Sequence, residues 1–192
     1  MKLIAQGAEA KIYDAKDNIL KHRIKKSYRL PEIDSKLRKS RTRAEAKLLR
    51  MAARAKVNVP NVIDVDEKDM KLEIEKIDGT KIRDILTPEL CKKIGQQISK
   101  MHKANIVHGD LTTSNMILRK NDVVLIDFGL SQYSEKVEDQ AVDIHLFKEC
   151  LKSKHFDMWQ ECWKEFLAGY RNATVLKRLD IVELRGKYKK VI

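Results

Sequence analysis

Two short polar motifs, joined by a predicted hairpin, constrain this chain more than any other feature. The motif HGDLTTSN covers residues 108–115, and the motif IDFG covers residues 126–129. Between them, a strand from Met116 to Leu118, the turn Lys120-Asn121-Asp122 and the strand VVLID predict a hairpin. A lone D-F-G is a weak signal, whereas the two motifs with a strand-turn-strand between them form a specific one.

Three side chains of these motifs predict phosphoryl transfer. Asp110 and Asn115 lie on the loop before the hairpin, and Asp127 lies at the end of its second strand. Phosphoryl transfer needs metal ions that hold the β- and γ-phosphates and a carboxylate that orients the nucleophile, but little covalent help from the protein. We therefore expect Asn115 and Asp127 to hold the metals and Asp110 to act as the base, while His108 braces the loop.

The chain before residue 78 predicts a strand-rich lobe with one helix. The segments KLIAQ, AKIYDA and ILKHRI predict a three-stranded meander, and residues 62–77 alternate around EKDM as a hairpin does. Residues 31–56 predict a helix between these two groups of strands. The helix could begin at Thr42, where Thr42 and Glu45 have the spacing of a capping box, or near Asp34 and continue through.

The chain after Asp78-Gly79 predicts mostly helices. Thr87-Pro88 caps a segment whose apolar residues form one helical stripe, namely Leu90, Ile94, Ile98 and Met101. Residues from about 137 to 184 are again helical and precede a basic tail. We therefore predict a minimal, two-lobed protein-kinase-like fold of the α+β class, with an N-lobe of residues 1–77 and a C-lobe of residues 78–192.

The phosphate-binding lysine is expected on the third strand, where protein kinases carry V-A-I-K. Lys21, Lys25 and Lys26 compete for this role. Because residues two apart in a strand share a face, Ile19 and Lys21 would face the cleft together, Ile19 against the adenine and Lys21 against the phosphates. Lys25 and Lys26 lie past the alternating segment, so we assign the role to Lys21.

A helical glutamate should form an ion pair with Lys21, and Glu45 in RTRAEAKLL is the first candidate. The capping box offers Glu45 a competing role, and one side chain cannot fill both. We favour the ion pair, with Glu32 as the fallback.

Two further segments are expected to contact a nucleotide. The loop QGAEA carries a single glycine where protein kinases have G-x-G-x-x-G, and its Gly7, Ala8 and Glu9 are the candidates. The segment LEIEKIDG lies between the lobes, where the backbone carbonyl of Glu75 and the N–H of Ile77 would meet the adenine edge.

Other features depart from an ordinary protein kinase. HGD replaces H-R-D, so the arginine that reads a phosphorylated activation loop is absent, and regulation by that route is not expected. Thr112 stands where protein kinases usually carry a lysine, and no A-P-E follows Gly129. The chain that remains after Gly129 is too short for the usual peptide-substrate platform, which favours ATP hydrolysis over peptide phosphorylation.

Taken together, these residues resemble the small atypical kinases of the KEOPS complex, the PRPK-type kinases, in an archaeal stand-alone form. The segments that carry the resemblance span residues 6–190 and are QGAEA, LKHRIKKSYRLPEID, RTRAEAKLL, HGDLTTSN, IDFGLS and LRGKYKK. RIO kinases and aminoglycoside phosphotransferases share the HGD-type loop, but the phosphotransferases usually lack the D-F-G.

The resemblance implies both an activity and partners. It implies an atypical Ser/Thr kinase and ATPase that uses ATP with Mg²⁺, or with Mn²⁺ in its place. Its ATP hydrolysis would support the synthesis of N6-threonylcarbamoyladenosine in tRNA. The implied partners are the ASKHA-fold tRNA threonylcarbamoyl transferase subunit, the other KEOPS subunits and, through the complex, tRNA.

The charge of the chain leaves two alternatives open. The net charge is +12, which attracts polyanions such as RNA. One alternative is a non-catalytic basic RNA-binding adaptor, supported by a cluster formed by Lys36, Arg38, Lys39, Arg41 and Arg43. The other is a RIO-like ribosome-assembly kinase.

Membrane and disulfide classes are not expected. The longest apolar run, Val123-Val124-Leu125-Ile126, is far below the ~20 residues of a membrane span. The three cysteines form no C-x-x-C pair, and an odd number argues against a disulfide framework, so we expect ordinary thiols in a cytoplasmic protein.

Overall fold

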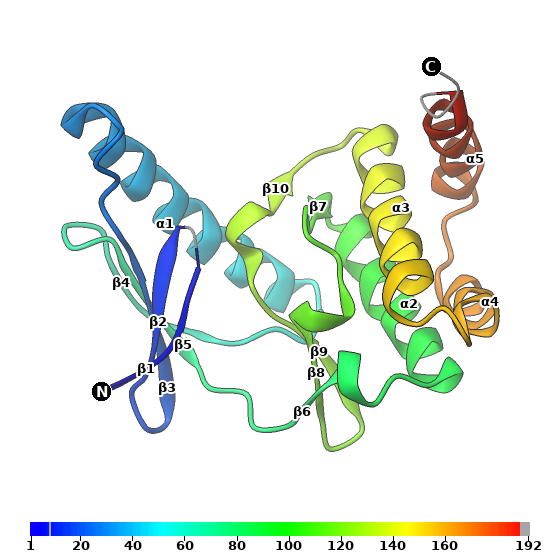
Figure 1. Ribbon diagram of the computed structural model, residues 1–192, viewed down its shortest axis with the longest axis horizontal. Helices are drawn as coiled ribbons and strands as arrows, with labels where there is room; N and C mark the ends of the chain where they lie inside the picture. The colour runs from blue at the N-terminus through cyan, green and yellow to red at the C-terminus, as the bar shows by residue number, and fades with distance from the viewer. Residues whose placement is uncertain (8, 189–192) are drawn as a thin grey trace.

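A five-stranded antiparallel sheet forms the N-terminal part of the computed structural model, which describes residues 1–7 and 9–188 (Figure 1). Its strand order is β1-β2-β3-β5-β4. The strands are β1 (Lys2–Gln6), β2 (Ala10–Asp14), β3 (Asn18–Arg23), β4 (Val62–Asp66) and β5 (Lys71–Glu75). The predicted meander and hairpin are confirmed, and the pairing of Lys21 with Leu72 joins them through β3 and β5.

Helix α1 (Pro31–Arg54) is a single helix of 24 residues. Its start at Pro31 shows that the capping-box start at Thr42 is wrong and that the helix runs through. The φ angle of Pro31 is already fixed near the helical value. The negative charges of Glu32 and Asp34 in the first turn stabilise the positive N-terminal end of the helix dipole. Thr42 is buried inside the helix, where its Oγ1 donates to the carbonyl of Arg38 at 2.9 Å. Glu45 is therefore mid-helix and has no capping role.

The C-terminal part is mainly helical (Figure 1). Its helices are α2 (Pro88–Lys103), α3 (Val137–Lys154), α4 (Trp159–Gly169) and α5 (Ala173–Tyr188), so the helical stretch expected from 137 to 184 is divided into three. Helix α2 packs on α4, and α3 packs on α5. Thr87 caps α2 as predicted, because its side chain accepts a hydrogen bond from the N–H of Leu90.

Short strands and 3-10 turns lie between the five-stranded sheet and these helices along the chain, and between α2 and α3. Two small sheets are formed by β6 (Thr80–Lys81), β8 (Met116–Arg119) and β9 (Asp122–Leu125), and by β7 (Ile106–Val107) with β10 (Gln132–Tyr133). Three 3-10 turns are η1 (Ile82–Asp84), η2 (Thr113–Asn115) and η3 (Phe128–Leu130).

The β8–β9 hairpin aligns the two polar motifs. Met116 pairs with Leu125, so the residue before β8 and the residues after β9 lie at the same end of the hairpin. The N–H of Ile126 donates to the carbonyl of Asn115 at 2.9 Å, which extends the pairing by one step. The backbone therefore places Asn115 beside the D-F-G motif.

Two sets of contacts join the N-terminal sheet and helix α1 to the C-terminal part. The first set lies in the segment between α1 and β4. The carbonyl of Asn58 accepts a hydrogen bond from the N–H of Leu125 at 2.9 Å, and the Asn58 N–H donates to Gln97 Oε1 of α2 at 3.0 Å. A second link is the ion pair between Glu75 of β5 and Arg119 of β8, at 2.7 Å. These contacts hold α1 and its Glu45 at a fixed place relative to the hairpin.

Candidate functional site

Lys21 is the centre of the candidate active site. Its Nζ lies 2.7 Å from Glu45 Oε1 and 2.7 Å from Asp127 Oδ1. Strand β3, helix α1 and the turn after β9 each contribute one member of this triad. The lysine expected from strand periodicity and the glutamate expected on the helix thus belong to a single cluster.

The charges of the triad stabilise one another. Burial alone would lower the pKa of Lys21, but the carboxylates of Glu45 and Asp127 outweigh it and raise the pKa above its usual value. Partial burial would raise the pKa of Asp127, whereas Lys21 holds it below its usual value. Near neutral pH, Lys21 is therefore a cation and Asp127 an anion.

Asp110 and Asn115 lie together on the loop before β8. The Asn115 Nδ2 amide donates to Asp110 Oδ2 at 2.7 Å and to the Asp110 carbonyl at 2.9 Å. Both donor hydrogens of this amide are thereby used, which leaves its Oδ1 as an acceptor. The geometry orients Asp110 and Asn115 as one unit.

The donor set fits a magnesium ion. Asp127 Oδ1 accepts from Lys21 and from the N–H of Gly129 at 3.3 Å, while Oδ2 accepts no hydrogen bond within residues 1–7 and 9–188. A carboxylate oxygen and an amide oxygen are ligands that Mg²⁺ takes together with substrate phosphates. No group of three or more His, Cys, Asp or Glu able to hold a metal is found in the described part of the chain.

The backbone at both motifs has left-handed residues. Asp127 has φ 62°, a conformation that Asp tolerates better than most residues. Gly109 has φ 78°, and a Cβ there would lie 2.4 Å from the carbonyl oxygen of Leu130. The middle position of the HGD motif therefore accepts only glycine without rearrangement.

Asp143 of α3 anchors the HGD loop and was not predicted from the sequence. Its carboxylate is fully buried and accepts from the N–H groups of His108 and Gly109, both at 2.9 Å. The His102 ring, hydrogen-bonded in turn to the Tyr170 hydroxyl at 2.9 Å, lies 3.1 Å from the same carboxylate. Burial would raise the pKa of Asp143, but the hydrogen bond and charge of His102 lower it.

One signal in the sequence could have pointed to Asp143. A carboxylate beside the apolar residues Ala141, Ile144 and Phe147 of a predicted helix is an unusual buried group. His108, predicted to brace the loop, does so: its Nε2 lies 3.1 Å from the Ile126 carbonyl and its Nδ1 accepts from the Asp110 N–H at 3.3 Å.

The candidate nucleotide contacts lie on the sheet side of this cluster. Ile19 is half-buried on β3, two residues before Lys21, and the half-buried Ile77 follows β5. Within the described residues, the N–H of Ile77 makes no backbone hydrogen bond. The Glu75 side chain, as distinct from its backbone carbonyl, accepts hydrogen bonds from Asn61 and Arg119.

The QGAEA loop is less open than the sequence suggests. The N–H of Gly7 donates to the carbonyl of Ala10 at 3.0 Å, and Ala8 lies outside the described residues. The Glu9 carboxylate contacts Arg41 of α1, Arg23 of β3 at 3.5 Å and Arg29 at 3.7 Å. These arginines lower the pKa of Glu9, with the hydrogen bond from Arg41 the largest influence.

Among the described residues, four of the five cations in the basic cluster of α1 have carboxylate partners. Arg38 pairs with Asp34 at 2.7 Å, Arg41 pairs with Glu9, and Arg43 and Lys39 both pair with Glu67. The Arg43 and Lys39 side chains are at least half exposed, so their shared partner Glu67 offsets their charge only weakly.

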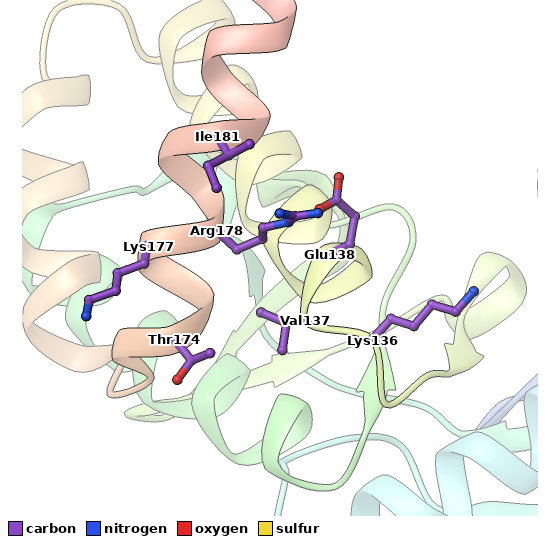
Figure 2. Close-up of a pocket in the computed structure, with 7 residues that line it drawn as sticks. All are labelled: Lys136, Val137, Glu138, Thr174, Lys177, Arg178 and Ile181. Carbon is purple, nitrogen blue, oxygen red and sulfur yellow. The ribbon is translucent and has the colours of Figure 1, made fainter.

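A hollow of about 490 Å³ lies apart from the triad, between the start of α3 and α5 (Figure 2). In Figure 2, Arg178 of α5 points toward Glu138 of α3, and these two form an ion pair that Arg185 joins at 2.6 Å. The other lining residues are Lys136, Val137, Thr174, Lys177 and Ile181. Arg185 of the basic tail is thus paired within the chain, while Lys189 and Lys190 lie outside the described residues.

Cys91 and Cys162 are buried and Cys150 is half-buried, all three as free thiols. Among the described residues, no helix is long and apolar enough to cross a membrane.

Comparison with known proteins agrees with this geometry. The RIO domain model matches residues 8–152. The KEOPS complex subunit Bud32 of Pyrococcus abyssi is 44% identical over 98% of this chain and 97% of its own length. The chain belongs to the RIO domain family, among the Bud32 proteins. The resemblance seen in the sequence is confirmed.

Two other relatives carry informative names. A probable serine/threonine-protein kinase BUD32 homolog of Archaeoglobus fulgidus is 36% identical over 95% of this chain and 94% of its own length. A probable bifunctional tRNA threonylcarbamoyladenosine biosynthesis protein of Methanothermobacter thermautotrophicus is 44% identical over 97% of this chain, which spans 36% of that protein. These names favour the KEOPS kinase interpretation over the ribosome-assembly and adaptor alternatives.

Solved structures confirm the kinase-like fold. The amicoumacin kinase hAmiN, solved with AMP-PNP and Ca²⁺, has a TM-score of 0.64 at 14% identity and covers 88% of this chain, which covers 71% of it. The Rio2 kinase of Chaetomium thermophilum, solved as an ADP/Mg²⁺-phosphoaspartate complex, has a TM-score of 0.60 at 15% identity, with 98% and 72% covered. At such identities the likeness concerns the fold.

Proposed function

We propose that this chain is an Mg-ATP-dependent atypical Ser/Thr kinase and ATPase that serves as the kinase subunit of a KEOPS complex. The observation that carries the proposal is the position of Lys21, which lies 2.7 Å from both Glu45 and Asp127. Lys21 and Asp127 neutralise each other's charge in this structure. The Lys21 ammonium is complementary to nucleotide phosphates, and the Asp127 carboxylate is complementary to a metal ion.

The site residues take separate roles in this proposal. Lys21, held by Glu45, binds the nucleotide phosphates, and Asp127 with Asn115 would hold Mg²⁺. The metal supplies charge neutralisation at the phosphate oxygens. Asp110, oriented by the Asn115 amide, accepts the proton of the attacking hydroxyl or water.

The nucleotide would lie between two lobes, with the boundary after Ile77. Gly7 would cover the phosphates, and Ile19 with the backbone of Glu75 and Ile77 would receive the adenine. The N–H of Ile77 supports this placement, because it makes no backbone hydrogen bond to another described residue.

The partners proposed are those of the complex. We place the chain in the cytoplasm, bound to the ASKHA-fold tRNA threonylcarbamoyl transferase subunit and the other KEOPS subunits, with tRNA reached through the complex. The name of the Pyrococcus relative supports the complex. ATP hydrolysis would then support tRNA N6-threonylcarbamoyladenosine synthesis.

Magnesium-dependent ATP binding and hydrolysis test the proposal. ATP should raise the melting temperature only when Mg²⁺ is present, because a ligand that binds only the folded state stabilises it. ATP hydrolysis should increase when the transferase subunit and tRNA are added. Asp127→Ala should lose both effects. An Asp127→Ala chain that keeps the ATP-induced rise in melting temperature would contradict the assignment.

A further inference from the structure

Arg23 is a second cation on the glutamate that holds Lys21. Glu45 Oε1 lies 2.7 Å from Lys21 Nζ, and Glu45 Oε2 lies 2.6 Å from Arg23 Nη2. Lys21 and Arg23 are two residues apart on β3, so both side chains leave the same face of the strand. Each oxygen of Glu45 therefore has its own cation.

Arg23 is deeply buried, and its charge is compensated locally. Its side chain is 4% exposed and that of Glu45 is 3% exposed. A buried guanidinium needs anionic partners, and Glu9 supplies a second one, 3.5 Å from Arg23 Nη1. Arg23 Nη2 also lies 3.6 Å from the position that a Cβ on Gly129 would take, which places it directly beside the D-F-G turn.

In this arrangement Glu45 has a contact that does not depend on Lys21, the residue proposed to bind the phosphates. When Lys21 binds phosphates and Asp127 binds a metal, the Lys21 ammonium is shared among several anions. In a kinase whose helical glutamate depends on the lysine alone, the helix position becomes a point of control. Here Glu45 Oε2 contacts Arg23, not Lys21, at 2.6 Å.

We propose that Arg23 is a positioning residue for phosphoryl transfer: it keeps Glu45, and with it Lys21, in place whether or not a nucleotide is bound. The inference rests on the proposed function. It also accounts for a kinase-like site without the arginine of H-R-D, because α1 needs no phosphorylated loop to hold it.

Substitutions at Arg23 test this inference through steady-state ATP hydrolysis by the full chain. Arg23→Met removes the charge but keeps the bulk, and kcat should fall roughly 10- to 100-fold, as expected for a misplaced catalytic group. KM for Mg-ATP should change much less. Arg23→Lys should recover part of kcat, since one ammonium can contact Glu45 but cannot replace the fork.

A double-mutant cycle separates positioning from general stability. Because both residues act through one contact, Arg23→Met and Glu45→Gln should be strongly non-additive in kcat. Arg29→Met is the matched control, because Arg29 contacts Glu9 but not Glu45, and it should leave kcat within about twofold of the wild type.

The following outcomes decide the inference. Unchanged kcat in Arg23→Met, or additive losses in the cycle, would overturn it. If Arg23→Met does not fold, Arg23→Lys and Arg23→Gln decide: losses of kcat at a near-normal melting temperature support it, and wild-type kcat in both overturns it. A wild-type chain without Mg-ATP hydrolysis or Mg-ATP stabilisation would instead overturn the proposed function, and this inference with it.

Discussion

At the level of single residues, Lys21 differs from the neighbouring lysines by its place in the strand. Strand β3 ends at Arg23, so Lys25 lies beyond it and is exposed. Lys21→Ala should lower kcat for ATP hydrolysis by about 10²–10³, because it removes a preorganised charge from a partly dry site. Lys25→Ala should change kcat less than about twofold. Equal losses in the two variants would show that the strand-period assignment chose the wrong lysine.

Gly109 illustrates a residue whose identity is imposed by backbone geometry. Its φ is 78°, and the Leu130 oxygen lies 2.4 Å from the position that a Cβ would take, so there is no room for a side chain. Gly109→Ala should destabilise the fold by roughly 1–3 kcal/mol. A fall of several degrees in melting temperature is the expected reading. Gly7→Ala is the control, since among the described residues a Cβ there meets only the Ala10 oxygen, at 3.9 Å. Equal melting temperatures for Gly109→Ala and the wild type would contradict this account.

At the level of secondary-structure elements, Glu9 connects the start of β2 to α1 through Arg41. Both side chains are more than a third exposed, at 37% and 38%, and an exposed pair is worth roughly 0.2–1 kcal/mol. If the contact positions the segment that covers the phosphates, Glu9→Gln and Arg41→Gln should both raise KM for Mg-ATP, by about two- to fivefold.

The signs of the two KM changes distinguish a positioning role from a direct electrostatic effect. A purely through-space effect on the phosphates would have opposite signs, because one variant removes a negative charge and the other a positive charge. Arg43→Gln is the control on the same helix, since Arg43 pairs with Glu67 instead. Opposite changes in KM for Glu9→Gln and Arg41→Gln would refute the positioning role of the contact.

For the molecule as a whole, Asp143 links the acid stability of the fold to the HGD loop. Its pKa in the folded state lies below the ordinary value of 3.8, with His102, His108 and Tyr170 as the titratable groups around it. The ionised carboxylate therefore contributes its full stabilisation above pH 3.8 and loses it as the pH falls through the folded-state pKa.

Asp143→Asn should remove this part of the acid sensitivity. Asn keeps one acceptor oxygen in place of two, and a buried donor left without a partner costs roughly 1–3 kcal/mol, so the variant should be less stable at pH 7. Urea unfolding between about pH 7 and pH 3 should show a shallower loss of stability below about pH 4 than in the wild type. A variant with an unchanged acid limb would show that Asp143 does not contribute to it.

Features that depend on neighbours along the chain could be predicted from the amino-acid sequence. The hairpin, the strands around Lys21 and the Thr87 cap follow from local periodicity and turn chemistry. The HGD and D-F-G motifs could also be recognised from the sequence. Because the β8–β9 hairpin between them is short, its register brings Asn115 beside the D-F-G motif.

The pairing of distant charges, by contrast, depends on the tertiary fold. Glu45 could cap a helix or bind a lysine, and the continuation of α1 from Pro31 settled this in favour of the lysine. The turn of Glu9 toward Arg41, the second cation at Arg23 and the anchor at Asp143 were not predictable in the same way. Each joins elements far apart in the chain, and a buried charge takes its partner by proximity in the folded molecule, which no local pattern encodes.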